Sequence, residues 1–405
     1  MKWLLPVLAC WSVQGYAHQI PQTQSGLNVD FSVVANWRSA NVVDEYQFWQ
    51  VPGTLMGGHA YPARQGVVVE EATLGLAYRF DANTYGVMAL ASHAGDGEHA
   101  SVALEHAYVG VMCCQENGPW VAEIGQMSGM FSPRLARHAK DRWFADADLA
   151  HDVLFGRHLH DEGVRVWLHE TKGWSVGLEG WRGKAFPATD HSNAGAWDVF
   201  ARYQLQTTLW HALVGGWWYE ASAQARADHR YGGGHQHTPI APPGQTAPLF
   251  ADVRYTGDTR LAGVYADLRF DALAHGRVGL ELEMIDAELD GVVHDGIRQA
   301  NLQATQQTLT VQPYWQWQAH TLAMRYEHIR TDNQLVGAAA PRLAQESGLA
   351  NPEQITPRRY GIAWHWQWRD ALALRTEWLR DESTERARNR VAVGVTWQYR
   401  ATPHH

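Results

Sequence analysis

The chain has 405 residues, of which 45% are hydrophobic and 19% are charged, and its formal net charge is −9. This composition excludes a disordered segment, and after the first seventeen residues no apolar run approaches the roughly 20 residues of a membrane-spanning helix. The acidic balance excludes nucleic acid as a partner on electrostatic grounds. Twenty Trp, fifteen Tyr and thirty-seven Gly favour an aromatic-rich β protein.

Residues 1–17 have the pattern of a secretory signal peptide. A basic residue precedes an apolar stretch, and the small residues Gly15 and Ala17 occupy the positions that a signal peptidase requires. A lipoprotein acylated at Cys10 and an uncleaved anchor are the alternatives. We expect an exported protein whose residues 18–405 form a single domain.

The rest of the chain alternates apolar and polar residues with a period of two, which is typical of β-strands. Sixteen strands are predicted, at residues 27–37, 67–80, 84–92, 101–112, 120–129, 159–169, 174–181, 196–205, 209–219, 259–270, 277–289, 308–318, 321–330, 359–369, 372–380 and 390–399. For strands 101–112 and 209–219 the sequence does not decide which face points inward and which points outward.

The predicted connections alternate in length. Tight turns fall at 81–83, 170–173, 206–208, 271–276, 319–320 and 370–371, and long polar segments fall near 38–66, 130–158, 220–258, 290–307 and 331–358. Barrels of the outer membrane have short turns on the periplasmic side and long loops outside. The sequence therefore predicts an all-β fold, a transmembrane antiparallel up-and-down β-barrel of about 16 strands.

The two faces of single strands support this fold class. Val391, Val393 and Val395 share one face of the last strand with Trp397. Hydrocarbon cannot solvate polar groups, so such an apolar face should point outward to lipid. Aromatic residues near strand ends, such as the run 217–219, are expected at the membrane boundary.

A barrel of about sixteen strands leaves an aqueous channel unless it is plugged. Only about nine residues separate the signal peptide from the first strand, so the constriction should come from the connection at 130–158, folded inward. Its pore-constriction candidates are Arg134, Arg137, Lys140, Arg142, Asp146, Asp148 and Asp152. The basic side chains could attract anions, and the acidic side chains could attract cations. Alternatively, these charges pair with one another or face solvent.

Strand phasing also predicts which charges line the lumen. The inward candidates are Glu71, Glu123, Glu179, Asp198, Asp267, Glu281, Glu283, Glu327 and Glu377, against Arg79, Arg165, Arg202, Arg269, Arg325 and Arg375. Oppositely charged residues two positions apart, such as Arg325 with Glu327 and Arg375 with Glu377, should neutralise each other's charge. The remaining acidic excess indicates a mild cation preference, which a few well-placed loop arginines could override.

Several short runs resemble a known family. They are residues 71–76, Gly125-Gln126 with 131–133, and Gly156-Arg157 with 163–166. With them the chain resembles Gram-negative porins of the phosphate-selective porin O and P type. The resemblance implies a sixteen-stranded barrel, a homotrimer and an inward-folded third external loop. The phosphate-selective members rely on abundant lumenal Arg and Lys, whereas this chain is acidic and has four Lys.

The sequence contains 22 His, three of them in a Gly-rich segment at His229, His235 and His237. Imidazoles at this spacing could bind zinc, copper or nickel if further ligands arrive, and the alternative is solvated loop histidines. The adjacent Cys113 and Cys114 could form a vicinal disulfide, share a soft metal ion or have no function.

Catalysis has little support in the sequence. No zinc-protease His-Glu-x-x-His pair is present, and no cofactor motif points to a bound cofactor. We expect a porin of the outer membrane, embedded in its lipid bilayer, for passive diffusion of small hydrophilic solutes or ions. The alternatives are a porin that facilitates entry of divalent metals such as zinc, and a non-conducting structural or adhesin barrel.

Overall fold

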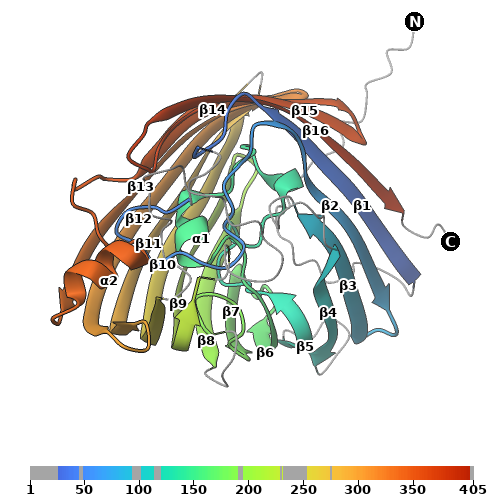
Figure 1. Cartoon of the computed structure of the whole chain (residues 1–405). Coiled ribbons are helices and arrows are strands. Elements are labelled where there is room, and N and C mark those ends of the chain that lie inside the picture. Colours follow the sequence, from blue (N-terminus) through green and yellow to red (C-terminus); the bar gives the residue numbers. More distant parts are fainter. Residues whose placement is uncertain are drawn as a thin grey trace, which may run out of the picture.

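The computed structural model describes residues 26–44, 49–93, 102–113, 120–189, 195–228, 230, 253–273 and 276–401. Sixteen antiparallel strands follow one another around a closed barrel, and the first strand pairs with the last (Figure 1). The predicted fold class and strand number are confirmed. No helix among the described residues is long and apolar enough to cross a membrane, a finding that does not bear on β-barrels.

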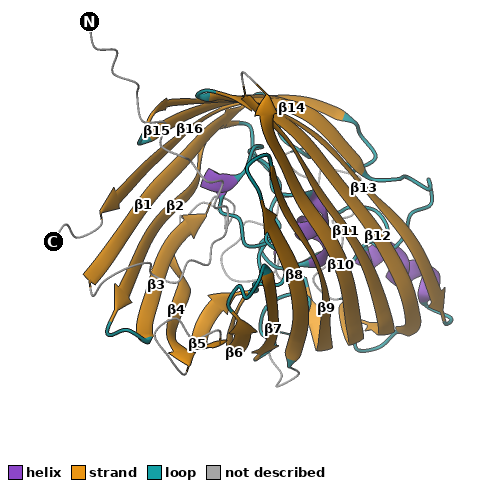
Figure 2. Ribbon diagram, turned by 180° about the vertical axis from the view of Figure 1, so that it is seen from behind, coloured by secondary structure: helices purple, strands orange, loops and turns teal. Residues whose placement is uncertain are grey.

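The strands lie close to their predicted positions. Their bounds are β1 (Gly26–Arg38), β2 (Gly66–Arg79), β3 (Thr84–His93), β4 (Val102–Cys113), β5 (Trp120–Ser128), β6 (His160–Leu168), β7 (Trp174–Trp181), β8 (Ala196–Gln206), β9 (Trp210–Ala227), β10 (Arg254–Leu273), β11 (Gly276–His294), β12 (Gln299–Trp317), β13 (His320–Val336), β14 (Arg358–Arg369), β15 (Leu372–Glu382) and β16 (Arg388–Ala401). A short helix, α2 (Ala340–Ser347), packs beside β12 and β13 (Figure 2).

Strands β9 to β13 are longer than predicted, and this corrects the expected alternation of short and long connections. The segment 290–307 is not a long loop, because β12 already begins at Gln299 and only residues 295–298 form the turn. The carboxylate of Asp295 accepts backbone hydrogen bonds from Ile297 and Arg298 and closes this turn. Polar residues on the outer face of β12 concealed the strand, since the prediction required an apolar outer face.

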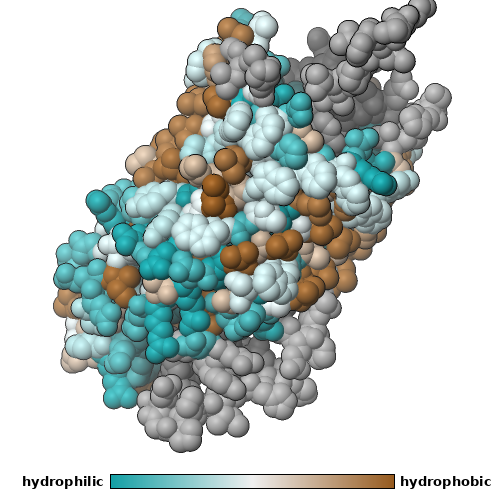
Figure 3. All heavy atoms as spheres, turned by 90° about the horizontal axis from the view of Figure 1, so that it is seen from above, coloured by the Kyte–Doolittle hydropathy of each residue, from teal (hydrophilic) through white to brown (hydrophobic). Residues whose placement is uncertain are grey.

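The outer surface of the barrel is apolar. Val391, Val393 and Val395 of β16 are 41–44% exposed, whereas Ala392 between them is 4% exposed. The predicted outward face of this strand is therefore confirmed. Figure 3 shows hydrophobic side chains gathered over part of the outer surface, beside a hydrophilic region. Such a surface suits contact with hydrocarbon.

The two strands whose faces the sequence does not decide have definite faces in the structure. In β9, Trp217 and Tyr219 are 5% and 0% exposed and point inward, whereas Trp218 is 38% exposed on the outer face. The expectation that all three rings lie at the membrane boundary is wrong for Trp217 and Tyr219. Successive residues of a strand point to opposite faces, so a run of three rings cannot share one side.

In β4 the alternation is interrupted by a β-bulge. Ala89 of β3 pairs with His106, but the next residue of β3, Leu90, pairs with Leu104. Glu105 is thus an extra residue that shifts the register, which explains the ambiguous face of this strand. Cys113, the last residue of β4, is in a disulfide, and Cys114 lies outside the described residues.

Candidate functional site

The connection between β5 and β6, residues 129–159, lies inside the ring of strands (Figure 1). It contains a 3-10 turn, η1 (Ala139–Asp141), and a short helix, α1 (Leu149–Leu154), all six residues of which are buried. The Gly129 amide donates to the Leu159 carbonyl at 3.2 Å and closes the base of the connection. We call residues 129–159 the inner loop.

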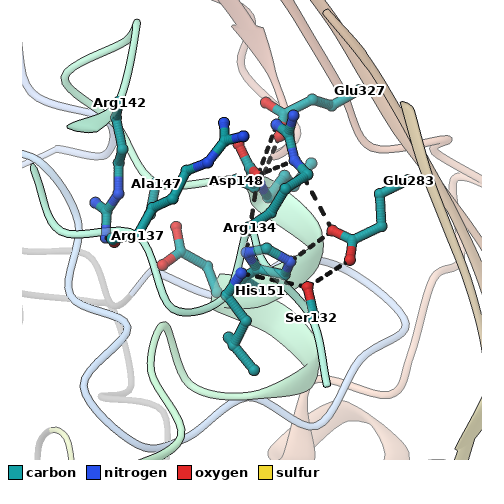
Figure 4. A network of polar contacts seen from close by, with 12 residues as sticks. Ser132, Arg134, Arg137, Arg142, Ala147, Asp148, His151, Glu283 and Glu327 are labelled. Carbon is teal, nitrogen blue, oxygen red and sulfur yellow. Dashed lines mark hydrogen bonds and ion pairs between the residues drawn. The ribbon is translucent and has the colours of Figure 1, made fainter. Parts of the chain in front are cut away.

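Two arginines of the inner loop share one carboxylate of the barrel wall. The Nη1 atoms of Arg134 and Arg137 lie 2.6 Å and 2.7 Å from the same Oε2 atom of Glu281 in β11. Arg134 also donates from Nε to Asp148 of the loop at 2.9 Å. Figure 4 shows Arg134 at the centre of this network. All four side chains are buried.

Asp148 joins the loop to a second part of the wall. Its Oδ1 atom lies 3.1 Å from Nη2 of Arg325 in β13. Burial raises the pKa of the Asp148 carboxyl, but the charges of Arg134 and Arg325 outweigh burial and hold this pKa well below its usual range. Asp148 is therefore ionised at neutral pH, and it connects a loop arginine to a wall arginine.

Further hydrogen bonds fix α1 to the wall (Figure 4). Glu283 of β11 accepts a hydrogen bond from Ser132 Oγ at 2.6 Å and contacts His151 Nε2 at 2.7 Å. Glu327 of β13 accepts from the backbone amide of Leu149 at 2.7 Å. The inner loop is thus held by wall carboxylates at both its charged side chains and its backbone.

A second charge cluster surrounds Asp146. This carboxylate contacts Arg38 of β1 at 3.5 Å and pairs with Arg390 of β16. Burial raises the pKa of Asp146, but the arginines, Arg390 foremost, outweigh it and hold the pKa well below its usual range. Asp152 pairs with Arg157 at 2.8 Å within the loop.

Lys140 and Arg142, the remaining predicted constriction residues, differ in whether they form an ion pair. Lys140 donates to Asp30 of β1 at 2.8 Å. Arg142 donates to the Arg137 carbonyl at 3.0 Å, and within the described part of the chain no carboxylate lies at ion-pair distance from it. Burial lowers the pKa of its guanidinium below the ordinary value. Arg142 lines a small, mainly polar cavity of about 10 Å³, the size of one water molecule, together with Arg137, Asp148 and Arg325.

The predicted lumenal residues of the strands fall into two groups. The first group is buried inside the barrel and comprises Glu71, Glu123, Arg165, Glu179, Asp198, Glu281, Glu283, Arg325, Glu327, Arg375 and Glu377. The two predicted same-strand pairs, Arg325 with Glu327 and Arg375 with Glu377, each approach to 3.8 Å. The second group, Arg79, Arg202, Asp267 and Arg269, is partly exposed: Arg79 donates to the Asp81 carbonyl in the following turn, and Arg202 lies over the Phe200 ring.

Sequence reasoning missed an apolar surface inside the barrel. We call it the aromatic wall, and it comprises the inward rings of Trp167, Trp181, Phe200, Trp217 and Tyr219 on β6 to β9. Phe131 and Phe155 of the inner loop pack on it, with ring centroids 4.8 Å and 5.9 Å from Trp217. The opposite surface, the charged wall, comprises Glu281, Glu283, Arg325, Glu327, Arg359, Arg375, Glu377, Asp381 and Arg390 on β11 to β16.

A cluster of histidines and glutamates was also missed. His93 Nε2 lies 2.6 Å from Glu105 Oε1, and His138 Nδ1 of the inner loop lies 3.2 Å from Glu71 Oε1. Burial lowers the pKa of His138, but Glu71 and Glu105 outweigh it and raise the pKa to about 9. These residues come from three strands and a loop, so no local sequence pattern could have joined them.

Two other sequence features bear on function. His229, His235 and His237 lie outside the described residues. The run from Gly173 to Gly177 has the Gly-x-Ser-x-Gly spacing of a serine nucleophile elbow, but Ser175 lies within β7 and not at a strand-to-helix turn. This run therefore gives no support to a hydrolase.

The closed antiparallel ring, its apolar exterior and its loop-occupied interior with a charged wall define a membrane β-barrel. The chain matches no protein-family model and no curated protein. Its fold is similar to that of a loop L8 deletion mutant of OmpT, an outer membrane protein of Vibrio cholerae, with 11% identity over 93% of this chain and 99% of that chain and a TM-score of 0.54.

Two further solved structures share the fold. The outer membrane channel DcaP of Acinetobacter baumannii is 10% identical over 93% of this chain and 97% of that chain, with a TM-score of 0.52. OprB of Pseudomonas putida is 10% identical over 93% of this chain and 94% of that chain, with a TM-score of 0.50. The chain therefore has the fold of outer-membrane β-barrels, as the sequence predicted.

Proposed function

We propose that this protein is an outer-membrane porin that lets small hydrophilic solutes or ions diffuse passively, with the inner loop setting the constriction. One observation carries the proposal. The charged wall meets loop residues Arg134, Arg137 and Asp148 in ion pairs that surround a small polar cavity. Fixed charges around a narrow polar space are the means by which pores select ions.

Selectivity would follow from the charges that remain available to a solute. Arg134 and Arg137 share Glu281, so neither offers a full positive charge to an anion. A phosphate-selective porin, which the sequence resembles, needs cationic side chains that an anion can contact. We therefore favour a general channel over a phosphate-selective one.

A non-conducting barrel is the second candidate, and a specific observation favours it. The connection before β2 also enters the interior, where Trp49, Val51 and Met56 are buried in the same apolar cluster as Phe131 and Phe155. The amide of His59 donates to the Gly156 carbonyl at 2.8 Å and ties the two connections together. Two connections that fill one interior leave less room for a solute.

Single-channel recording in a planar lipid bilayer under a salt gradient separates the two candidates. Discrete current steps support the porin, and their absence in a correctly folded barrel supports the non-conducting alternative. Replacing Arg134, Arg137 and Arg142 together by Gln should shift the reversal potential toward cations, since the acids of the wall stay. An unshifted potential would show that the inner loop does not line the narrowest point.

The resemblance to trimeric porins supports a homotrimer, which light scattering of the detergent-solubilised protein tests. A mass of one or two chains per particle would contradict it. Metal binding by His229, His235 and His237, in a loop that the sequence predicts to be external, stays a prediction.

A further inference from the structure

The β-bulge in β4 turns two successive metal-ligating side chains toward the barrel interior. In a regular strand Glu105 and His106 would point to opposite faces. The extra residue at Glu105 breaks this alternation, and the two side chains are 3% and 6% exposed inside the barrel. Bulges are common beside functional sites, where they redirect a side chain.

The inner loop brings a third ligand to the same place. Glu105, His106 and His138 each offer one ligand atom, and these three atoms all lie within 4.8 Å of one another. The Oε2 atom of Glu105 accepts no hydrogen bond among the described residues, and its contact with His138 Nδ1 is 3.9 Å long. A buried carboxylate oxygen without a hydrogen bond is costly unless a cation or water meets it.

Further histidines and carboxylates surround Glu105, His106 and His138. The ring centroids of His106 and His160 lie 5.5 Å apart, and His158 stacks on His160 at 5.5 Å. Glu105 Oε1 contacts His93, and Glu71 contacts His138. Contacts between carboxylates and imidazoles of this kind orient the ligands of zinc sites.

We propose that Glu105, His106 and His138 bind a divalent transition-metal ion, with zinc as the best fit, inside the barrel. Two imidazoles and one carboxylate match the ligand preference of zinc, whereas magnesium and calcium prefer oxygen alone. Tetrahedral zinc keeps its ligand atoms about 3.4 Å apart. The three ligand atoms lie within 4.8 Å of one another, so side-chain rotation has to bring them closer when the ion binds.

The site lies toward the end of the barrel that carries the longer connections. His93 ends β3 and His160 begins β6, and both of these strand ends adjoin the longer connections, which lie outside the cell in outer-membrane barrels. The side chains of His93 and His138 are 25% and 15% exposed. Glu71 and Glu105 already attract positive charge to this place. The site goes beyond the proposed function, because metal can bind whether or not ions pass.

Cobalt titration of the untagged, folded full-length barrel in detergent tests the site, because the visible absorption of Co²⁺ reports nitrogen and oxygen ligation and zinc displaces it. We expect one tight ion per barrel. Glu105→Gln/His106→Gln should weaken binding by at least about tenfold. The matched control His328→Gln removes a histidine from the outer face of β13 and should leave binding unchanged.

The external-loop variant His229→Ala/His235→Ala/His237→Ala separates the two metal hypotheses. The proposal expects it to retain the tight ion. Loss of that ion in the external-loop variant alone, unchanged binding in Glu105→Gln/His106→Gln, or no binding by the wild type would each overturn the proposal.

Two measurements guard against misfolding and against confusion with channel activity. Heat-modifiable electrophoretic mobility shows whether each variant is a folded barrel, and His138→Asn tests the site from the loop without altering a strand. Conductance in KCl without metal is measured separately. A barrel that binds the ion but carries no current would overturn the porin and leave the metal site standing, and the reverse result would do the opposite.

Discussion

The aromatic wall and the charged wall hold the same inner loop by different forces. On β6 to β9 the side-chain contacts are mainly between rings, with Phe131 and Phe155 against Trp217 and Tyr219, and the Met130 amide also donates to Glu179 of β7 at 2.8 Å. On β11 to β16 they are mainly ion pairs and hydrogen bonds, among them those from Arg134 and Arg137 to Glu281 at 2.6 Å and 2.7 Å. One side therefore buries apolar area, and the other fixes direction and charge.

The two kinds of contact have different effects on the inner loop: one stabilises it, and the other fixes its position. Burial of apolar rings is non-directional and stabilises the loop wherever the rings meet. Buried ion pairs add little net stability because desolvation offsets their attraction, but removing one partner is costly. We infer that the aromatic wall keeps the inner loop inside the barrel, and the charged wall determines which charges face the passage.

The largest expected effect comes from the aromatic wall. Phe131→Ala/Phe155→Ala should release the loop, since each buried Phe→Ala change costs about 3–5 kcal/mol. We expect a several-fold higher single-channel conductance and rapid tryptic cleavage at Arg137 and Arg142. Phe80→Ala is the control, because Phe80 is 58% exposed on the outer face. Unchanged conductance and cleavage would assign retention of the loop to the charged wall.

The next effect should come from the charged wall. Glu281→Gln leaves Arg134 and Arg137 without their shared carboxylate, and removing one partner of a buried pair costs about 3–5 kcal/mol. We expect a reversal potential shifted toward anions and a lower denaturant midpoint. Glu288→Gln, on the outer face of the same strand, is the matched control. A shift toward cations would show that Glu281 does not face the passage.

The barrel could be predicted from the sequence because its main signals are local. Period-two alternation located all sixteen strands, and the outward face of β16 followed from Val391 to Val395. The predicted position of the aromatic rings in β9 was wrong, because an aromatic run in a strand can have two different causes. Rings at Trp217 and Tyr219 indicate a membrane boundary or a buried interior surface equally well, and only the register of β9 distinguishes the two.

The contacts of the inner loop could not be predicted from the sequence. Arg134 and Glu281 are 147 residues apart, and no periodicity encodes a contact between a loop and a distant strand. The loop residues could be named as candidates because they are charged and follow a strand end. Their partners, and the histidines around Glu105, depend on how the barrel closes and on a single bulged residue.

A smaller effect should come from Arg142, which lines the cavity without a carboxylate partner among the described residues. Arg142→Gln should shift the reversal potential toward cations and leave the denaturant midpoint unchanged, because no ion pair is lost. Lys172→Gln, in the turn before β7, serves as the control for a surface charge. If Arg142→Gln lowers the midpoint as much as Glu281→Gln does, Arg142 supports the loop and does not tune the passage.

The smallest effect is expected from mild acid. The arginines around Asp146 and Asp148 hold the pKa of both carboxyls below the unfolded value of about 3.9. A lowered pKa gives stability that is present above the unfolded value and is lost only as the pH falls through the folded one. Hydrogen exchange of residues 130–158, corrected for intrinsic rates, should therefore show equal protection at pH 7 and pH 5. Loss of protection at pH 5 would mean that the charged wall holds the loop through groups that titrate higher, and Asp148→Asn, which removes the charge at every pH, should reduce protection at both.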